Sequence, residues 1–201
     1  MEETGGITLS GQWVLQEAWQ QVKDWQDALP EDCPVNINVN LSARQLTQND
    51  LANQVSEVLE ETGLPARSLR LEITETAIMH NSKEALEVLK QLRDLNVGLC
   101  IDDFGIGYSS LSRLQQLPID ILKIDRSFVQ NIGARGENTE IVRTIIDLAD
   151  SLNMDIVAEG VETKEQLEGL RALGCQNVQG FYFAKPMTPE DALQFIKDSN
   201  L

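Results

Sequence analysis

The sequence predicts an α/β protein with a parallel sheet. Short apolar segments that suit strands alternate with amphipathic helical segments along all 201 residues. An acid, amide or lysine lies at or near the end of each predicted strand. Such alternation indicates parallel strands joined by right-handed helical crossovers, either in a doubly wound sheet or in a (β/α)8 TIM-type barrel. Ligands bind at the carboxyl ends of the strands in both folds.

The first half of the chain is expected to hold three helices and three strands. Apolar residues with helical spacing predict the helices, at Leu9–Leu29, Gln45–Thr62 and Ser82–Leu95. Apolar alternation or short buried runs predict the strands, at Pro34–Asn40, Leu69–Thr74 and Val97–Asp103. Gly63 and Pro65 are the stop signal of the second helix.

The second half continues the alternation with four helices and three strands. The expected strands are Ile119–Ile124, Met154–Ala158 and Asn177–Phe183. Helices are expected at Ser110–Leu117, Glu140–Leu152, Thr163–Leu173 and Thr188–Ile196. Thr163 with Gln166 is a capping box, and Pro189 suits the first turn of the last helix.

Composition excludes several classes of protein. A net charge of −16 argues against a surface that binds a nucleic acid polymer by neutralising phosphates. Three widely spaced cysteines indicate neither a disulfide framework nor a zinc site. No apolar run approaches the ~18 residues of a membrane helix, and no linker divides the chain. We therefore expect a single domain over residues 1–201, located in the cytoplasm.

The segment Leu99–Leu111, LCIDDFGIGYSSL, is the clearest candidate for a site. It is a predicted buried strand that ends in Asp102 and Asp103 and continues into a glycine-rich loop. Neighbouring side chains of a strand point to opposite sides, so both acids can share a site only if Gly105 and Gly107 allow a turn. The alternative is that these acids only cap the turn or the following helix.

The strand ends together offer mainly oxygen ligands. Ten polar residues lie at or near them: Asn40, Glu72, Glu75, Asp102, Asp103, Lys123, Asp125, Glu159, Glu162 and Gln179. Carboxylates with an amide, in a chain with one histidine, favour Mg²⁺ or Mn²⁺ over zinc. Two such ions would activate a water and stabilise a phosphoryl group, which makes phosphodiester hydrolysis the natural chemistry.

Seven motifs resemble the EAL-domain family in order and spacing. They are VNLSARQL (39–46), LEITE (71–75), IDDFGIGYSSL (101–111), LPIDILKIDRSFV (117–129), AEGVET (158–163), LGC (173–175) and QGFYFAKP (179–186). The resemblance implies a (β/α)8-type barrel that hydrolyses cyclic di-GMP (c-di-GMP) to pGpG with a two-metal site of Mg²⁺ or Mn²⁺. It also implies that this barrel is incomplete, with about six strands, and that the first two strands and the EAL tripeptide lie upstream.

The resemblance assigns a role to each candidate residue. The implied metal ligands are Asn40, Glu72, Asp102, Asp103 and Glu159. The implied catalytic residues are Glu159 as general base, Lys123 on the attacking water or a phosphate oxygen, and Glu162 as an orienting group. The implied substrate contacts are Arg44, Gln45 and Gln179, and Glu75 would anchor the loop from Phe104 to Ser110.

Two functions stay open at this point. The first is a c-di-GMP phosphodiesterase domain. The second is a catalytically impaired module that binds c-di-GMP or another protein, because the glutamate of the EAL tripeptide is not in this sequence. The expected partners are c-di-GMP, a second copy in a homodimer, and sensory or GGDEF domains of a parent protein that can itself be membrane-anchored.

Overall fold

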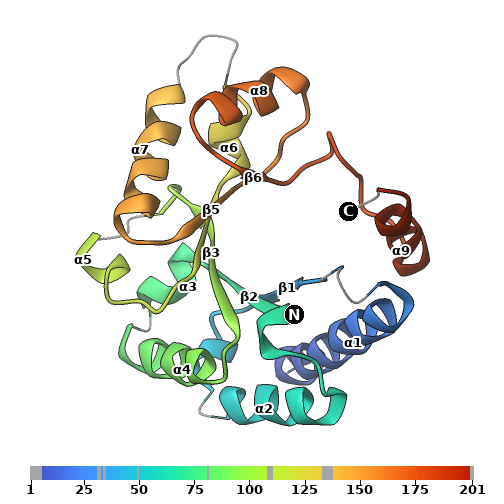
Figure 1. Ribbon diagram of the computed structural model, residues 1–201. Coiled ribbons are helices and arrows are strands. Elements are labelled where there is room, and N and C mark those ends of the chain that lie inside the picture. The colour runs from blue at the N-terminus through green and yellow to red at the C-terminus, as the bar shows by residue number, and fades with distance from the viewer. Residues whose placement is uncertain are drawn as a thin grey trace. The chain divides into compact units, whose positions relative to one another are not determined.

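The computed structural model describes residues 6–30, 33, 35–48, 50–80, 82–107, 111–132 and 138–199. Within them six strands form one sheet, hydrogen-bonded in chain order (Figure 1): β1 (Ile37–Leu41), β2 (Leu69–Thr74), β3 (Gly98–Phe104), β4 (Ile121–Ile124), β5 (Asp155–Ala158) and β6 (Asn177–Val178). The pairs β3–β4, β4–β5 and β5–β6 are parallel. The predicted α/β fold with six strands is thereby confirmed, and parallel strands in chain order are the arrangement of a (β/α)8-type barrel.

The described residues divide into two compact units. The first contains residues up to 72, residues 82–98 and residues 186–199. The second contains residues 73–80 and the described part of 99–185.

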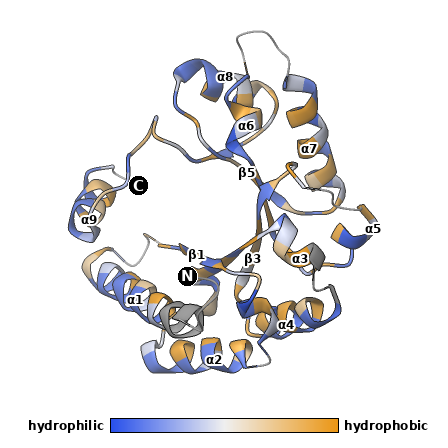
Figure 2. Ribbon diagram, turned by 180° about the vertical axis from the view of Figure 1, so that it is seen from behind, coloured by the Kyte–Doolittle hydropathy of each residue, from blue (hydrophilic) through white to orange (hydrophobic). Residues whose placement is uncertain are grey.

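Helices pack on one another and on β1 in the first unit. Helix α1 (Gly6–Ala28) contacts both β1 and α2 (Leu51–Thr62), and α4 (Ser82–Asp94) contacts α2. The largest side chain of this core is Trp19, which is fully buried. Polar and apolar residues alternate along α2 and α4, as expected of amphipathic helices with one packed face (Figure 2). The last helix, α9 (Pro189–Asp198), is capped by the Thr188 hydroxyl, which accepts from the Asp191 N–H.

The predicted helix Gln45–Thr62 is two elements in the structure. A short 3-10 helix, η1 (Gln45–Thr47), ends at Gln48, whose backbone is extended. Helix α2 then begins at Leu51 and ends at Gly63, a left-handed cap with φ of 68°. The apolar spacing continued across this break, so periodicity alone joined the two elements.

The second unit carries the carboxyl ends of β3 to β6. Helix α7 (Thr139–Ser151) packs on β4, β5 and the short helix α6 (Arg126–Val129). All four residues of β4 are buried. Helix α8 (Lys164–Ala172) begins with the predicted capping box of Thr163 and Gln166, which is confirmed. Helices α3 (Glu75–His80) and α6 were not predicted, and the predicted helix after residue 110 is the single turn α5 (Leu111–Leu114).

The predicted strand Asn177–Phe183 is wrong beyond Val178. The Phe183 N–H bonds to the Gly180 carbonyl, and the Tyr182 N–H bonds to the Val161 carbonyl, so the chain turns instead of extending. Gly180 lies so close to the Val161 backbone that a Cβ atom would overlap it. A glycine is therefore needed where the chain passes Val161. Most other bounds differ from the prediction by one to three residues, and Pro34 and Ser110 lie outside the described residues.

Among the described residues, no helix has both the length and the apolar character needed to span a membrane.

Candidate metal centre and adjoining cavity

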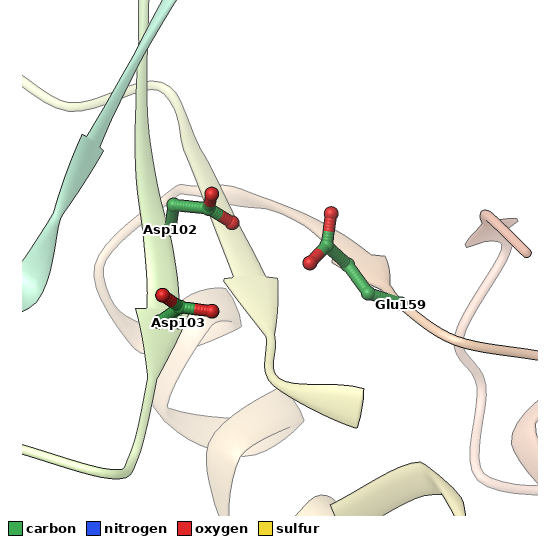
Figure 3. A group of neighbouring side chains, drawn as sticks. All are labelled: Asp102, Asp103 and Glu159. Carbon is green, nitrogen blue, oxygen red and sulfur yellow. The ribbon is translucent and has the colours of Figure 1, made fainter. Parts of the chain in front are cut away.

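The two adjacent acids at the end of β3 face the same side. Asp103 has a φ of 54°, in the left-handed region, and the β3–β4 register shifts between Ile101 and Phe104. Such an irregularity re-aims a side chain. Figure 3 shows both carboxylates directed towards Glu159. We expected the change of direction at Gly105 and Gly107. It occurs at Asp103 itself, two residues before Gly105.

Three carboxylates form a compact cluster in the second unit. Asp102, Asp103 and Glu159 each offer one oxygen, and these three atoms lie within 4.8 Å of one another. All three residues are half-buried. Lys123, at the end of β4, is almost fully buried and places its Nζ 3.2 Å from Asp102 Oδ1 and 2.5 Å from Glu159 Oε1. One buried ammonium group thus pairs with two of the three acids.

The donor set fits a hard divalent cation. Asp102 Oδ1 is buried, and no hydrogen bond reaches it within the described part of the chain, although the Lys123 ammonium lies near it as an ion pair. The ion pair with Lys123 offsets part of the cost of burying this oxygen, and its remaining lone pairs are available to a divalent cation. Because all the ligand atoms of the cluster are oxygens, magnesium or manganese suits it better than zinc.

Asp103 and Asp125 form an acid pair beside this cluster. Burial raises the pKa of Asp103, and the Asp102 and Asp125 carboxylates raise it further, while Lys123 opposes the shift. Burial also acts to raise the pKa of Asp125, but hydrogen bonds from Ser127, from the Arg126 N–H and from Asp103 outweigh it and lower that pKa. The Ser127 N–H lies 2.9 Å from Asp125 Oδ1. Of the two carboxyl groups, Asp103 is therefore the one that binds a proton more readily in the metal-free protein.

We expect Asp103→Asn to raise the melting temperature of the metal-free protein at neutral pH. A carboxyl whose pKa is raised by folding stabilises the fold while it is protonated, and this contribution is lost as pH rises through the folded pKa. Asparagine removes the charge and tolerates a positive φ. The gain should shrink towards zero as pH falls below the ordinary aspartate pKa of 3.8.

Thermal unfolding in EDTA between neutral and acidic pH measures this difference. Asp147→Asn, at an exposed position of α7, is the matched control and should leave the melting temperature unchanged at each pH. A gain that is equal at all pH values would show that charge is not its cause. With added Mn²⁺ the wild type should have the higher melting temperature, because the metal stabilises the protein that retains the Asp103 carboxylate.

Glu75 holds the loop that follows Asp103. Its buried Oε2 accepts hydrogen bonds from the backbone N–H groups of Gly105, at 3.1 Å, and of Gly107, at 3.3 Å. A Cβ at Gly107 would lie only 2.7 Å from the Glu75 carboxyl carbon. The loop thus depends on a glycine to reach this carboxylate.

A cavity of about 440 Å³ opens beside the carboxylate cluster. Its lining residues are Asp103, Asp125, Arg126, Glu159, Gly160, Glu162, Gln179, Gly180 and Phe181. Glu162 and Gln179 are exposed at this cavity, and the Glu162 N–H donates to Gln166 Oε1 at 2.7 Å. Phe181 is 57% exposed, which is unusual for a phenylalanine and offers a flat apolar face. The space and lining suit a ligand that has both polar and aromatic parts.

The other candidate residues lie in the first unit. Asn40 is exposed on β1, and Glu72 is buried on β2. Asn38 donates to Glu72 Oε1 at 2.7 Å, a contact that the sequence did not indicate. Arg44 is exposed before η1, whereas Gln45 is buried and its Oε1 accepts from the Ser42 N–H and hydroxyl. Gln45 therefore has a structural role in this turn.

Sequence reasoning gave no role to three residues of the cavity. The sequence places Asp125 at a strand end, but it does not indicate that Asp125 pairs with Asp103. Arg126 and Phe181 stood within recognised motifs and were passed over. Two features of the sequence could have indicated them. Arg126 is a cation directly after the acidic end of a strand, and Phe181 begins a run of three aromatic residues after Gly180.

The letters E, A and L occur once in the sequence, at Glu84–Leu86. They lie within α4 in the first unit, where Glu84 is exposed and Ala85 is buried. This occurrence is part of an amphipathic helix and not of a strand end.

A carboxylate cluster at the carboxyl ends of parallel strands is typical of metal-dependent α/β enzymes. A sequence model of one such group, the EAL domain, matches residues 1–186. The chain therefore belongs to the EAL domain family.

Relatives of known name support this assignment. The chain is 44% identical over 195 residues to the bifunctional diguanylate cyclase/cyclic di-GMP phosphodiesterase MucR of Pseudomonas aeruginosa, covering 97% of this chain and 28% of that protein. It is 40% identical to the oxygen sensor protein DosP of Escherichia coli, covering 94% and 24% respectively. The chain thus spans about a quarter of the length of these curated relatives.

Solved structures agree on the fold. The PaMucR phosphodiesterase in complex with c-di-GMP superposes with a TM-score of 0.89 at 43% identity, covering 95% of this chain and 76% of that one. The EAL domain of Mycobacterium smegmatis DcpA gives 0.87 at 36% identity, with 94% and 84% covered.

Proposed function

We propose that this chain is a c-di-GMP phosphodiesterase domain, which hydrolyses c-di-GMP to pGpG with two Mg²⁺ or Mn²⁺ ions. The observation that carries the proposal is the cluster of Asp102, Asp103 and Glu159 around buried Lys123. Its relatives include a named c-di-GMP phosphodiesterase and a structure with c-di-GMP bound, which gives the substrate class.

Each unit holds candidate metal ligands. Asp102, Asp103 and Glu159 would bind metal in the second unit, and Asn40 and Glu72 are the candidates of the first unit. When bound, such ions lower the pKa of a water and stabilise charge on the phosphoryl oxygens.

Glu159 is the general base in this proposal. Its carboxylate would accept the proton of the attacking water, and the Lys123 ammonium, 2.5 Å from Glu159 Oε1, orients that carboxylate. Lys123 also contacts Asp102, so one buried cation positions two of the acids. Glu75 fixes the loop after Asp103, and Glu162 would orient neighbouring groups of the site. The candidate contacts of the dinucleotide are Arg44, Gln45 and Gln179.

The wider setting is also proposed. Because the named relatives are several times longer and include a diguanylate cyclase and an oxygen sensor, sensory or GGDEF domains are the expected companions in a longer protein. A cytoplasmic location and a homodimer stay predictions.

Chromatography of c-di-GMP incubated with the purified chain tests the proposal. We expect pGpG to accumulate with Mg²⁺ or Mn²⁺, and EDTA to lower the rate by about a hundredfold or more, since the water is not activated without metal. Added metal in excess should restore the rate. Binding of c-di-GMP without any pGpG would instead identify a non-hydrolysing binding module.

A further inference from the structure

Arg126 lines the cavity, and the first part of its side chain is fixed by packing. It follows Asp125 at the end of β4 and is the first residue of α6, whose start is capped by the Asp125 carboxylate accepting from Ser127. Its Cβ packs directly on Gly160, which has a φ of 73° and where any side chain would collide with Arg126. Gly160 directly follows Glu159, so the stem of Arg126 lies next to the carboxylate cluster.

The guanidinium of Arg126 has no partner among the residues that the structure describes. Arg126 is exposed, and its side chain makes no hydrogen bond or ion pair with any other described residue. Four carboxylates line the same cavity, at Asp103, Asp125, Glu159 and Glu162, and Arg126 is the one cation among the described lining residues. An anionic ligand entering this cavity is therefore repelled by the carboxylates of the lining and attracted by Arg126 and by bound metal.

A cyclic dinucleotide carries two phosphodiester groups, but only one is hydrolysed at a time. In the proposed function the metal ions and Lys123 meet the charge of the attacked phosphate, and Lys123 is already held by Asp102 and Glu159. The second phosphate then needs a cation of its own. In a cavity of only about 440 Å³, that phosphate lies close to the lining carboxylates and is repelled by them.

We propose that Arg126 binds the phosphate of the dinucleotide that is not hydrolysed. This inference rests on the proposed function and extends it to substrate binding. It predicts that Arg126 contributes to affinity and leaves the chemical step largely unchanged.

Steady-state kinetics of Arg126→Ala and Arg126→Lys with c-di-GMP test the inference. We expect R126A to raise KM about tenfold while kcat stays within about twofold. R126K should recover most of the affinity, because a phosphate needs charge and accepts a point charge. The slope of log KM against log salt should fall by about one in R126A. Arg143→Ala on α7, an exposed arginine paired with Glu140, is the matched control and should behave as the wild type.

Three results would overturn the inference while the wild type hydrolyses c-di-GMP normally. An unchanged KM in R126A would show that Arg126 does not touch the ligand. Equal defects in R126A and R126K, with lost preference for c-di-GMP over c-di-AMP, would assign Arg126 to a base edge. A fall in kcat at unchanged KM would place it on the attacked phosphate. A wild type that neither binds nor hydrolyses c-di-GMP would overturn the proposed function itself and this inference with it.

Discussion

Glu159→Gln should lower kcat for c-di-GMP by about 10³-fold or more and leave nucleotide binding measurable. Glutamine keeps the size of the side chain and its carbonyl can still accept a hydrogen bond from Lys123, 2.5 Å away in the wild type. It cannot accept the proton of the attacking water, and it is a poor ligand for a divalent cation. Removal of a general base alone costs about 10²- to 10⁴-fold, and the loss of metal affinity adds to this.

Rates of pGpG formation and calorimetric binding of c-di-GMP, both with Mn²⁺, separate chemistry from binding. Glu165→Gln is the matched control, since Glu165 lies six residues further on, fully exposed in the first turn of α8. It should retain wild-type kcat. Turnover by E159Q at the wild-type rate would leave Glu159 only a structural partner of Lys123.

The sequence predicted the strand ends well because parallel topology is strongly patterned. The bounds of β2 agree with the predicted LRLEIT strand. The acids near the end of β3 and directly after β5 could be assigned to one edge of the sheet. The sequence alone therefore places four residues together at this edge: Asp102, Asp103, Lys123 and Glu159. The contact of Lys123 with two acids follows from neighbouring positions on β3, β4 and β5.

Features that depend on single dihedrals or on packing between distant segments were not predictable. The shared side of Asp102 and Asp103 depends on the positive φ of Asp103, which no periodicity encodes. The place of Arg126 at the cavity depends on contact with Gly160, 34 residues away in the sequence. The turn after β6 replaced a predicted strand because Gly180 packs against Val161, although the aromatic residues that follow favour a strand.

Gly180→Ala should destabilise the protein by about 3 kcal/mol or more and lower its melting temperature by roughly 6–12 °C. A methyl group at this position would overlap the backbone of Val161, including its carbonyl carbon at 2.7 Å. Backbone cannot rotate away as a flexible side chain can, so the segment after β5 or the turn after β6 has to move. Two hydrogen bonds fix these segments, from the Val161 N–H to the Gln179 carbonyl and from the Tyr182 N–H to the Val161 carbonyl.

The same displacement should reduce turnover, because Val161 lies two residues after Glu159 and directly before Glu162. Gly174→Ala separates packing from backbone conformation: Gly174 has a φ of 90° but no atom within 4 Å of an added Cβ. Its cost should be only the left-handed strain of alanine, about 1–2 kcal/mol, with kcat unchanged. Gly180 lies outside the left-handed region, so its larger cost would arise from contact alone. If G180A melts no lower than G174A and keeps full turnover, the two segments are not held as closely as the structure has them, and Glu159 is positioned by Lys123 without help from this turn.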